Sequence, residues 1–597
     1  MSDPSAVPSV TTPDELAREV ARLRDAWTQG SPEDIRLRSE CAAGLERLRA
    51  LYRKNPSLFG RPELAALRAL ADALADALKT PVSARALDGA ARAELKATFG
   101  YDTFRPGQEA IIAAVVAGRD CIGVMPTGAG KSLTYQLPAR LLGGTTLVVS
   151  PLIALMKDQV DALSELGVRA TFLNSTLEPD EKKRRIDALV RGDYEIVYAA
   201  PEGLEASVGT ALRHVRLSLI AVDEAHCISQ WGHDFRPAYR KLAGLRKRFG
   251  EAPILALTAT ATEDVVNDIV AQLGMREPAR YKGSFFRPNL HVHAYKKGGA
   301  SPIDVRSSIL RLARARRGES GIVYCLSRKS VEGIAEYLMQ NGVSARAYHA
   351  GLPPEERSSA QDAFRRDDVA VIVATVAFGM GIDKPNIRYV IHRDMPRSIE
   401  GYYQEIGRAG RDGLRSDCVL FYSYADVASY DRFVDDSSPE IAERHRRQVR
   451  EMLNLADASG CRHELLVGYL GEQIAPCKVS CDRCTASDIV ASSPRLVEKR
   501  RGKSRTEPAR VPADVDQSPP AYDDAVPSEL FQRLKQLRKA IADERRVPAY
   551  VVFSDATLLE MTAKKPSSEA ELLDVSGVGP KKIAAYGKAF LDLLRDG

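Results

Sequence analysis

The sequence has little of what marks exported, membrane-spanning or disulfide-stabilised proteins. Only nine of its 597 residues are cysteine, and the first residues lack the basic and apolar regions of a signal peptide. No apolar run approaches the roughly 20 residues that a membrane-spanning helix needs. We therefore expect a cytoplasmic protein in which clustered cysteines bind metal rather than pair as disulfides.

The sequence also lacks a strong charge of either sign. Its net charge of +6 is small beside its 85 basic and 79 acidic residues, so binding to a polyanion would depend on local basic patches. The length exceeds what one hydrophobic core supports and predicts several domains.

Hydrophobic periodicity changes along the chain. Residues 1–90 have helical spacing, as at Leu16 and Val20, and predict either a helical bundle that packs on the rest of the protein or a docking module for a partner. In residues 91–280, and again in 281–425, short β-branched runs such as CIGVM, LSLIAV and VAVIVAT alternate with helical patterns. This alternation predicts two tandem α/β domains with parallel sheets.

The C-terminal part divides into three further regions. Residues 426–488 contain a cysteine cluster, and residues 489–526 are polar and proline-rich, which predicts a flexible linker. Residues 527–597 return to helical periodicity and predict a small helical domain.

A nucleotide site is predicted directly after the run CIGVM. The loop there comprises Thr127, Gly128, Ala129, Gly130, Lys131 and Ser132. Its glycines allow backbone N–H groups to wrap phosphates, Lys131 offers a positive charge to them, and Ser132 offers a hydroxyl to Mg²⁺. Met125 stands where the general pattern has its first glycine.

Two carboxylates follow the expected strand LSLIAV. Asp223 and Glu224 stand at the carboxyl end of that strand, where open α/β sheets bind ligands. Asp223 suits coordination of Mg²⁺ together with Ser132, and Glu224 suits activation of an attacking water. The pair predicts hydrolysis of the bound nucleotide.

The second α/β region contains the segment QEIGRAGR, with Gln404, Arg408 and Arg411. We expect Arg408 and Arg411 to project from one side of a helix. Arginines that reach a γ phosphate stabilise transition-state charge, whereas the alternative is a solvated basic face.

A zinc site is predicted from the cysteine cluster. Cys461, Cys477, Cys481 and Cys484 are separated by fifteen, three and two residues. Four thiolates fit a closed tetrahedral site whose binding energy contributes to folding. His463 is an alternative ligand.

Taken together, these motifs resemble helicase superfamily two and, more narrowly, the RecQ family, over about residues 95–485. The segments that carry the resemblance are FGYDTFRPGQ, SPLIALMKDQV, DEAHCISQWGHDFRPAY, ALTATAT, SFFRPNL, AYHAGL, ATVAFGMGIDKPNIR and QEIGRAGRDG. The resemblance implies RecA-like α/β domains, ATP as the nucleotide, adenine binding by Tyr101, Arg105 and Gln108, and an arginine finger at Arg411.

The loop after the carboxylates is the family-specific part. Trp231, His233, Phe235 and Arg236 lie in it, and such side chains stack on the bases of single-stranded DNA. DNA bound there would act on the neighbouring Glu224. The alternative is that Trp231 and Phe235 only pack between the two α/β domains.

The C-terminal regions both follow and depart from the family pattern. Residues 527–597 resemble an HRDC domain. Lys581 and Lys582 follow a glycine turn in it, and we expect them to contact a DNA phosphate. The alternative is a helical domain that binds protein or has no role in DNA binding. The loop from Cys477 to Cys481 is one residue longer than usual in the family. The winged-helix domain that usually follows the zinc site has no room in this sequence.

These motifs predict an ATP-dependent DNA helicase that works in DNA repair, recombination or replication, bound to the nucleoid if the source is bacterial. Movement from 3′ to 5′ on single-stranded, tailed or forked DNA is implied by the resemblance. One alternative is a translocase or annealing factor with little unwinding. Another is a DNA-binding scaffold in which the N-terminal helices recruit a repair protein and ATP acts as a switch. The basic cluster in residues 495–505 is interpreted as a DNA contact, a targeting signal or a linker without further function, and the sequence does not decide among them.

Overall fold

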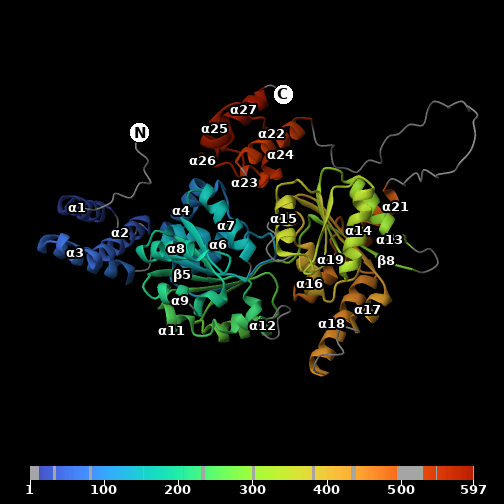
Figure 1. Ribbon diagram of the computed structural model, residues 1–597, viewed down its shortest axis with the longest axis horizontal. Helices are drawn as coiled ribbons and strands as arrows, with labels where there is room; N and C mark the ends of the chain where they lie inside the picture. The colour runs from blue at the N-terminus through green and yellow to red at the C-terminus, as the bar shows by residue number, and fades with distance from the viewer. Residues whose placement is uncertain are drawn as a thin grey trace, which may run out of the picture. The chain divides into compact units, whose positions relative to one another are not determined.

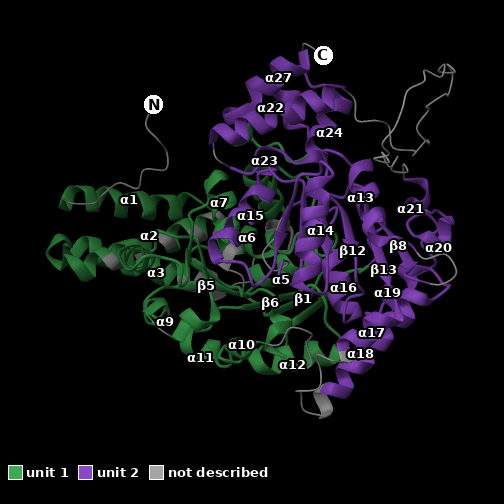
Figure 2. Cartoon of the chain, turned by 45° about the vertical axis from the view of Figure 1, so that its right-hand side comes forward, with its two compact units in different colours: residues 1–285, 380–383, 576–582 green, residues 286–379, 384–575, 583–597 purple. Residues whose placement is uncertain are grey.

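The computed structural model describes residues 12–30, 35–79, 84–151, 153–205, 207–229, 236–298, 303–378, 384–431, 439–493, 529–545 and 547–595. The chain folds as two compact units, coloured separately in Figure 2. Unit 1 comprises residues 1–285, 380–383 and 576–582, and unit 2 comprises residues 286–379, 384–575 and 583–597. Among the described residues no helix combines the length and apolarity needed to cross a membrane.

The N-terminal region is helical, as predicted. Its helices are α1 (Pro13–Gln29), α2 (Ile35–Lys54) and α3 (Arg61–Lys79), with a short 3-10 turn η1 (Pro56–Leu58). Thr12 caps α1 by accepting a hydrogen bond from the Glu15 N–H while the Glu15 carboxylate accepts one from the Thr12 N–H. Leu16, Leu45 and Leu74 share one buried core. The bundle therefore has an apolar interior of its own.

A parallel sheet of seven strands forms the centre of unit 1. The strand order is β3-β4-β2-β5-β6-β1-β7. The strands are β1 (Cys121–Val124), β2 (Thr145–Val149), β3 (Ala170–Leu173), β4 (Ile196–Ala199), β5 (Leu217–Val222), β6 (Ile254–Thr258) and β7 (Ala279–Lys282). Every residue of β1, β2, β4 and β6 is buried, which is why these strands are continuous apolar runs in the sequence.

Helices cover both faces of this sheet, as right-handed crossovers require. Figure 1 shows α6 and α7 on one side of it and α9, α11 and α12 on the other. The helices are α4 (Ala84–Glu94), α5 (Gln108–Val116), α6 (Leu133–Leu142), α7 (Ile153–Glu165), α8 (Pro179–Arg191), α9 (Ser207–Leu212), α10 (Pro237–Arg240), α11 (Leu245–Phe249) and α12 (Glu263–Leu273). Shorter turns are η2 (Leu95–Phe99), η3 (Pro201–Glu205) and η4 (Ala225–Ile228).

A second parallel sheet, of six strands, forms the centre of unit 2, with the order β10-β11-β9-β12-β13-β8. Its strands are β8 (Leu290–Lys296), β9 (Ser320–Tyr324), β10 (Ala345–Tyr348), β11 (Val371–Ala374), β12 (Ile387–His392) and β13 (Ser416–Tyr422). The helices that accompany it are α13 (Val305–Ala315), α14 (Arg328–Gln340), α15 (Pro354–Arg365), α16 (Ile399–Ile406) and α17 (Tyr424–Asp431). Two tandem α/β domains with parallel sheets, as predicted, are therefore confirmed.

The cysteine region and the C-terminal region are mostly helical. The former contains α18 (Pro439–Asp457), α19 (Arg462–Tyr469) and α20 (Asp482–Thr485), and the latter contains α22 (Glu529–Arg545), α23 (Ala549–Val552), α24 (Asp555–Lys564), α25 (Glu569–Leu573), α26 (Pro580–Lys582), η5 (Ile583–Gly587) and α27 (Lys588–Arg595).

One part of the predicted linker is ordered, which corrects its expected start at residue 489. Residues Ile489–Ser492 form the short helix α21, capped by the Asp488 side chain. Ile489 and Val490 are buried in the core of the second sheet, because burial of two apolar side chains outweighs the freedom of a linker there. The basic cluster at 495–505 lies outside the described residues.

Candidate active site and metal centre

The predicted phosphate loop joins β1 to α6 in unit 1. Gly128 and Gly130 have φ of 87° and 76°, a conformation that favours glycine. A Cβ atom on Gly130 would lie 2.5 Å from the Gln108 Nε2 atom. Both glycines are therefore required by the shape of the loop as well as by its expected ligand.

Side chains from the preceding segment hold this loop. The Gln108 Nε2 atom donates to the carbonyl oxygens of Ala129, at 3.2 Å, and Gly130, at 3.0 Å. Arg105 donates to the carbonyl oxygen of Gly128, and its own N–H donates to the Gln108 Oε1 atom at 2.8 Å. Tyr101 is exposed. Arg105 and Gln108 thus contact the loop backbone in addition to any contact with a base.

The neighbouring side chains of the loop are neither fully buried nor fully exposed. Thr127, Lys131 and Ser132 are half-buried, and the Lys131 Nζ atom donates to the Met125 carbonyl oxygen at 3.3 Å. An ammonium group has three N–H donors, so this contact with a neutral carbonyl leaves donors available for a phosphate.

The two carboxylates lie at the end of β5, on the same edge of the sheet as the phosphate loop. Asp223 is buried, and the Tyr239 hydroxyl donates to its carbonyl oxygen at 2.9 Å. Glu224 has φ of 47° although it is not glycine, and such strained backbone clusters at functional sites. The Glu224 N–H donates to the Asp223 Oδ1 atom at 3.0 Å.

The end of β6 connects these two parts. The Met125 N–H donates to the Thr258 carbonyl oxygen at 2.9 Å, and the Thr258 hydroxyl lies 3.0 Å from the His226 Nδ1 atom. The same nitrogen lies 3.4 Å from the Glu224 carboxylate. His226 and Thr258 therefore link the phosphate loop to the carboxylates. Neither residue has a role predicted from the sequence, although both lie within the motifs DEAHCISQWGHDFRPAY and ALTATAT.

The predicted DNA loop is only partly described. Trp231, His233 and Phe235 lie outside the described residues, so their expected stacking stays a prediction. Arg236 is described: its N–H donates to the Cys227 carbonyl oxygen at 2.9 Å, and its guanidinium donates to the Pro151 carbonyl oxygen at 3.3 Å.

The two arginines of unit 2 do not lie on a helix, so that prediction was wrong. Helix α16 carries Gln404 and ends at Ile406, and residues 407–413, including Arg408 and Arg411, form turns. Gly410 has φ of 56°, and a Cβ atom on it would lie 2.5 Å from the Asn289 Nδ2 atom. The left-handed backbone of Gly410 prevents an α-helix from continuing through to Arg411.

Two residues without a role predicted from the sequence hold this arginine segment. The Arg287 guanidinium donates to the carbonyl oxygens of Gly407 and Ala409, both at 2.9 Å, and to that of Gly410 at 2.6 Å. The Asn289 amide donates to the Gly410 carbonyl oxygen at 2.9 Å. Their only sequence signal is the motif SFFRPNL.

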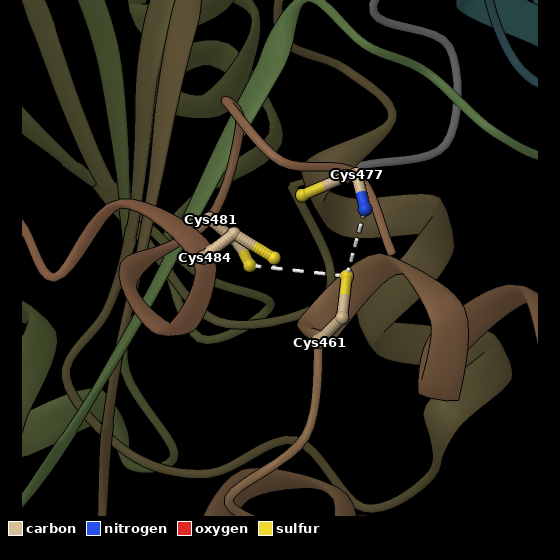
Figure 3. Close-up of side chains that lie close together, drawn as sticks. All are labelled: Cys461, Cys477, Cys481 and Cys484. Atoms are coloured by element: carbon tan, nitrogen blue, oxygen red, sulfur yellow. Dashed lines mark hydrogen bonds between the residues drawn. The ribbon is translucent and has the colours of Figure 1, made fainter. Parts of the chain in front are cut away.

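The four clustered cysteines meet as predicted. In Figure 3 their sulfur atoms turn toward a common centre, and the four lie within 4.8 Å of one another. The Sγ atoms of Cys461 and Cys481 are 4.0 Å apart, close to the roughly 3.8 Å that two thiolates of a tetrahedral zinc site require. Burial alone would raise the pKa of the Cys461 thiol, but N–H donors from Cys477 and Glu464 lower it below its ordinary value. The donor set fits Zn²⁺.

The extra residue of the cysteine loop is absorbed by a tight turn. Lys478 has φ of 64°, and the Val479 N–H donates to the Cys477 carbonyl oxygen at 2.8 Å. This turn brings Cys477 and Cys481 into one cluster despite three intervening residues.

His463 has another role than the alternative ligand considered from the sequence. Its Nε2 atom lies 2.9 Å from the Leu290 carbonyl oxygen and 3.1 Å from that of Ser480. The Val292 N–H also donates to Ser480, at 3.0 Å. His463 thus ties the cysteine loop to the edge strand β8.

Comparison with known families gives four matches along the chain. They are the DEAD/DEAH box helicase model at residues 105–269, the helicase conserved C-terminal domain at 304–413, the RecQ zinc-binding model at 424–485 and the HRDC domain at 528–594. The zinc-binding match contains all four clustered cysteines.

Comparison with whole proteins points the same way. The ATP-dependent DNA helicase RecQ of Pasteurella multocida is 38% identical to this chain, and the match covers 84% of this chain and 93% of that protein. The ATP-dependent DNA helicase RecQ of Bacillus subtilis is 36% identical, and the match covers 83% of this chain and 96% of that protein. A solved structure of Mss116p bound to single-stranded RNA and AMP-PNP has a TM-score of 0.50 at 16% identity, over 66% of this chain and 93% of that one, and supports the fold alone. The chain belongs to the RecQ family of ATP-dependent DNA helicases.

Proposed function

We propose that this helicase couples ATP hydrolysis to 3′ to 5′ movement along single-stranded DNA and thereby opens duplex DNA. The observation that supports this most is the connected edge of the first sheet. Hydrogen bonds join the phosphate loop to Thr258 and Thr258 to His226, and the His226 Nδ1 atom lies 3.4 Å from the Glu224 carboxylate. A change at the nucleotide phosphates would pass through these contacts to the carboxylates and the segment after them.

Each proposed role follows from the chemistry of the side chain. Lys131 binds the β and γ phosphates, Ser132 and Asp223 bind Mg²⁺, and Glu224 positions the attacking water. Mg²⁺ would supply charge neutralisation at the phosphates. Gln404, Arg408 and Arg411 act on the γ phosphate, with Arg411 as the arginine finger. Tyr101, Arg105 and Gln108 bind the adenine.

The DNA contacts belong to the segment after the carboxylates. Trp231, His233, Phe235 and Arg236 bind single-stranded DNA by stacking and charge. The hydrogen bond from Arg236 to Pro151 supports a link to a second motif, SPLIALMKDQV, of the same domain. The four cysteines hold a structural Zn²⁺ ion that stabilises the helices α18 to α20 on the second sheet.

Partners other than DNA are proposed only for the N-terminal helices α1 to α3, as a docking site for a repair protein. A cytoplasmic location is proposed because the proposed substrate is DNA.

The test compares ATP hydrolysis with strand separation in one preparation. ATPase activity is measured with and without single-stranded DNA, and unwinding is measured on 3′-tailed, 5′-tailed and forked duplexes. Lys131→Ala should abolish DNA-stimulated hydrolysis and unwinding, because the phosphates lose their charged partner. Lys183→Ala, which removes an exposed lysine of α8, is the matched control and should keep both activities.

Each other outcome has a defined meaning. Unwinding by Lys131→Ala would refute the proposed ATP site. Preference for the 5′-tailed duplex would refute the proposed direction. DNA-stimulated hydrolysis without strand separation on any duplex would favour a translocase.

A further inference from the structure

Three buried rings lie behind the arginine segment of unit 2. Tyr324 ends β9, His392 ends β12 and Tyr402 belongs to α16. The His392 ring stacks on the Tyr324 ring, with centroids 5.2 Å apart and planes at 23°, and meets the edge of the Tyr402 ring at 5.1 Å and 64°. All three side chains are at most 3% exposed. The ends of two strands thus fix the position of one face of α16.

His392 is also hydrogen-bonded to the last turn of α16. Its Nε2 atom lies 2.8 Å from the Glu405 Oε2 atom, and Glu405 is itself buried. A hydrogen bond to a carboxylate is stronger than one between neutral groups, and burial strengthens it further. Glu405 stands between Gln404 and the turn that carries Arg408, so this bond holds the point at which the helix ends.

Tyr324 contacts the arginine segment through its hydroxyl. That hydroxyl donates to the Phe378 carbonyl oxygen at 2.8 Å and accepts a hydrogen bond from the Arg408 guanidinium. Burial raises the pKa of Tyr324 to about 12, so the hydroxyl keeps its proton and can donate and accept at once. Phe378 belongs to the motif ATVAFGMGIDKPNIR, and Arg408 belongs to the motif QEIGRAGRDG. The Tyr324 side chain therefore connects these two motifs.

We propose that Tyr324 and His392 are positioning residues for ATP hydrolysis, Tyr324 by orienting the Arg408 guanidinium and His392 by fixing Glu405 at the end of α16. The proposal rests on the function proposed above for Arg408 and Arg411. No contact with the nucleotide is proposed for either positioning residue. Their effect comes from placing the arginines, and a misplacement of about 1 Å costs up to about a hundredfold in rate.

The hydroxyl of Tyr324 is tested by removing that single atom. In the full-length protein Tyr324→Phe should lower DNA-stimulated kcat about tenfold with little change in the KM for ATP, because an oriented arginine acts on the transition state. The matched control is Tyr389→Phe, a buried tyrosine of β12 near the charges of Arg316 and Glu319. This control should keep wild-type kcat and a similar midpoint of thermal unfolding.

A double-mutant cycle separates positioning from general stability. When Arg408 is already replaced by Ala, Tyr324→Phe should cause no further loss of kcat, because the hydroxyl then has no guanidinium to orient. Equal losses of kcat with Arg408 intact and in the Arg408→Ala variant would show that the hydroxyl acts only on stability and would overturn the proposal.

His392 is tested by separating its hydrogen bond from its ring. His392→Phe keeps the stacked ring and removes the bond to Glu405, and should lower kcat about tenfold with little change in KM. His392→Gln restores an N–H donor and should recover part of this loss. Glu405→Gln, which still accepts a hydrogen bond, should retain more activity than Glu405→Ala. Full activity of His392→Phe at unchanged thermal stability would refute the role of His392.

Failure of this proposal is distinguishable from failure of the proposed function. If Arg408→Ala and Arg411→Ala retain kcat, the arginines do not act on ATP and the proposed function is wrong. If both variants lose kcat but Tyr324→Phe and His392→Phe keep it, only the positioning role is wrong.

Discussion

Single residues with a left-handed backbone mark two of the sites in this helicase. Glu224 and Lys478 both have positive φ without being glycine, at 47° and 64°. At Glu224 the side chain is needed, because a carboxylate beside Asp223 is the proposed group for activating water. At Lys478 the backbone alone makes the turn that brings Cys477 and Cys481 together. We therefore expect that substitution by glycine relieves the backbone strain at Lys478 without loss of function, whereas at Glu224 it would also remove the carboxylate.

Lys478→Gly should stabilise the zinc-binding region by about 1 kcal/mol, since glycine adopts the left-handed conformation without the Cβ clash. The measurement is the chelator concentration at which half of the bound Zn²⁺ is lost, together with the thermal midpoint. Lys478→Ala keeps the Cβ atom and should give no gain. If the alanine variant gained as much as the glycine variant, the lysine side chain rather than the backbone would be the source of strain.

At the scale of secondary structure, the edge strand β8 contains a buried titratable group. His293 is 2% exposed, and burial lowers its pKa to about 4. In the unfolded chain a histidine titrates near pH 6.5, so below that pH the unfolded state binds a proton that the folded state excludes. The contribution to stability is therefore constant above about pH 6.5 and falls as the pH decreases toward 4, by at most about 3 kcal/mol.

His293→Leu should remove this part of the acid sensitivity, because leucine fills a similar volume and binds no proton. The measurement is the free energy of unfolding from pH 7.5 to 4.5 for both proteins at equal Zn²⁺. His291→Leu, at a half-buried position of the same strand, is the control and should keep the wild-type slope. Identical slopes for wild type and His293→Leu would contradict the prediction.

Strands that are buried on both faces could be predicted from the sequence, while several at the edges could not. β2 and β6 are continuous apolar runs in the middle of the first sheet. The edge strands β7 and β10 have the sequences ARYK and ARAY. No residue of β7 and only Ala345 of β10 is buried, and both strands have too little apolar content to be recognised. Pairing with a neighbour, rather than the local pattern, makes them strands.

The candidate site shows the same division between local and long-range information. The phosphate loop and the cysteine cluster are short or strongly patterned, and both could be predicted. The helix expected at Arg408 and Arg411 was wrong, because α16 ends at Ile406 and Gly410 has a left-handed backbone. Arg287, more than a hundred residues earlier, donates hydrogen bonds to the turns that follow the helix. Contacts over such sequence distances leave no periodic signal.

On the scale of the whole molecule, the N-terminal bundle α1 to α3 combines an independent core with contacts to the ATPase domain. Leu16, Leu45 and Leu74 are buried in its own interior, while α2 also contacts α6, the helix that follows the phosphate loop. The bundle supplies no residue to the proposed ATP or zinc sites. We therefore expect it to affect stability and partner binding rather than hydrolysis.

Deletion of residues 1–83 should leave DNA-stimulated ATPase activity in place and lower the thermal midpoint, because the surface of α6 that α2 covers becomes exposed. The decrease should be about 2–4 °C for each kcal/mol of contact that is lost. The control is the full-length variant Leu45→Asp. A charge at this buried position should unfold the bundle, so this variant should also keep DNA-stimulated ATPase activity and have a lower thermal midpoint. Loss of hydrolysis in the deletion but not in Leu45→Asp would mean that part of residues 1–83 acts on the nucleotide site directly. Binding of a repair protein is measured on an affinity column that carries the intact chain or either variant. If both variants keep ATPase activity but no longer bind a repair protein that the intact chain binds, the bundle is a docking module in addition to packing on α6.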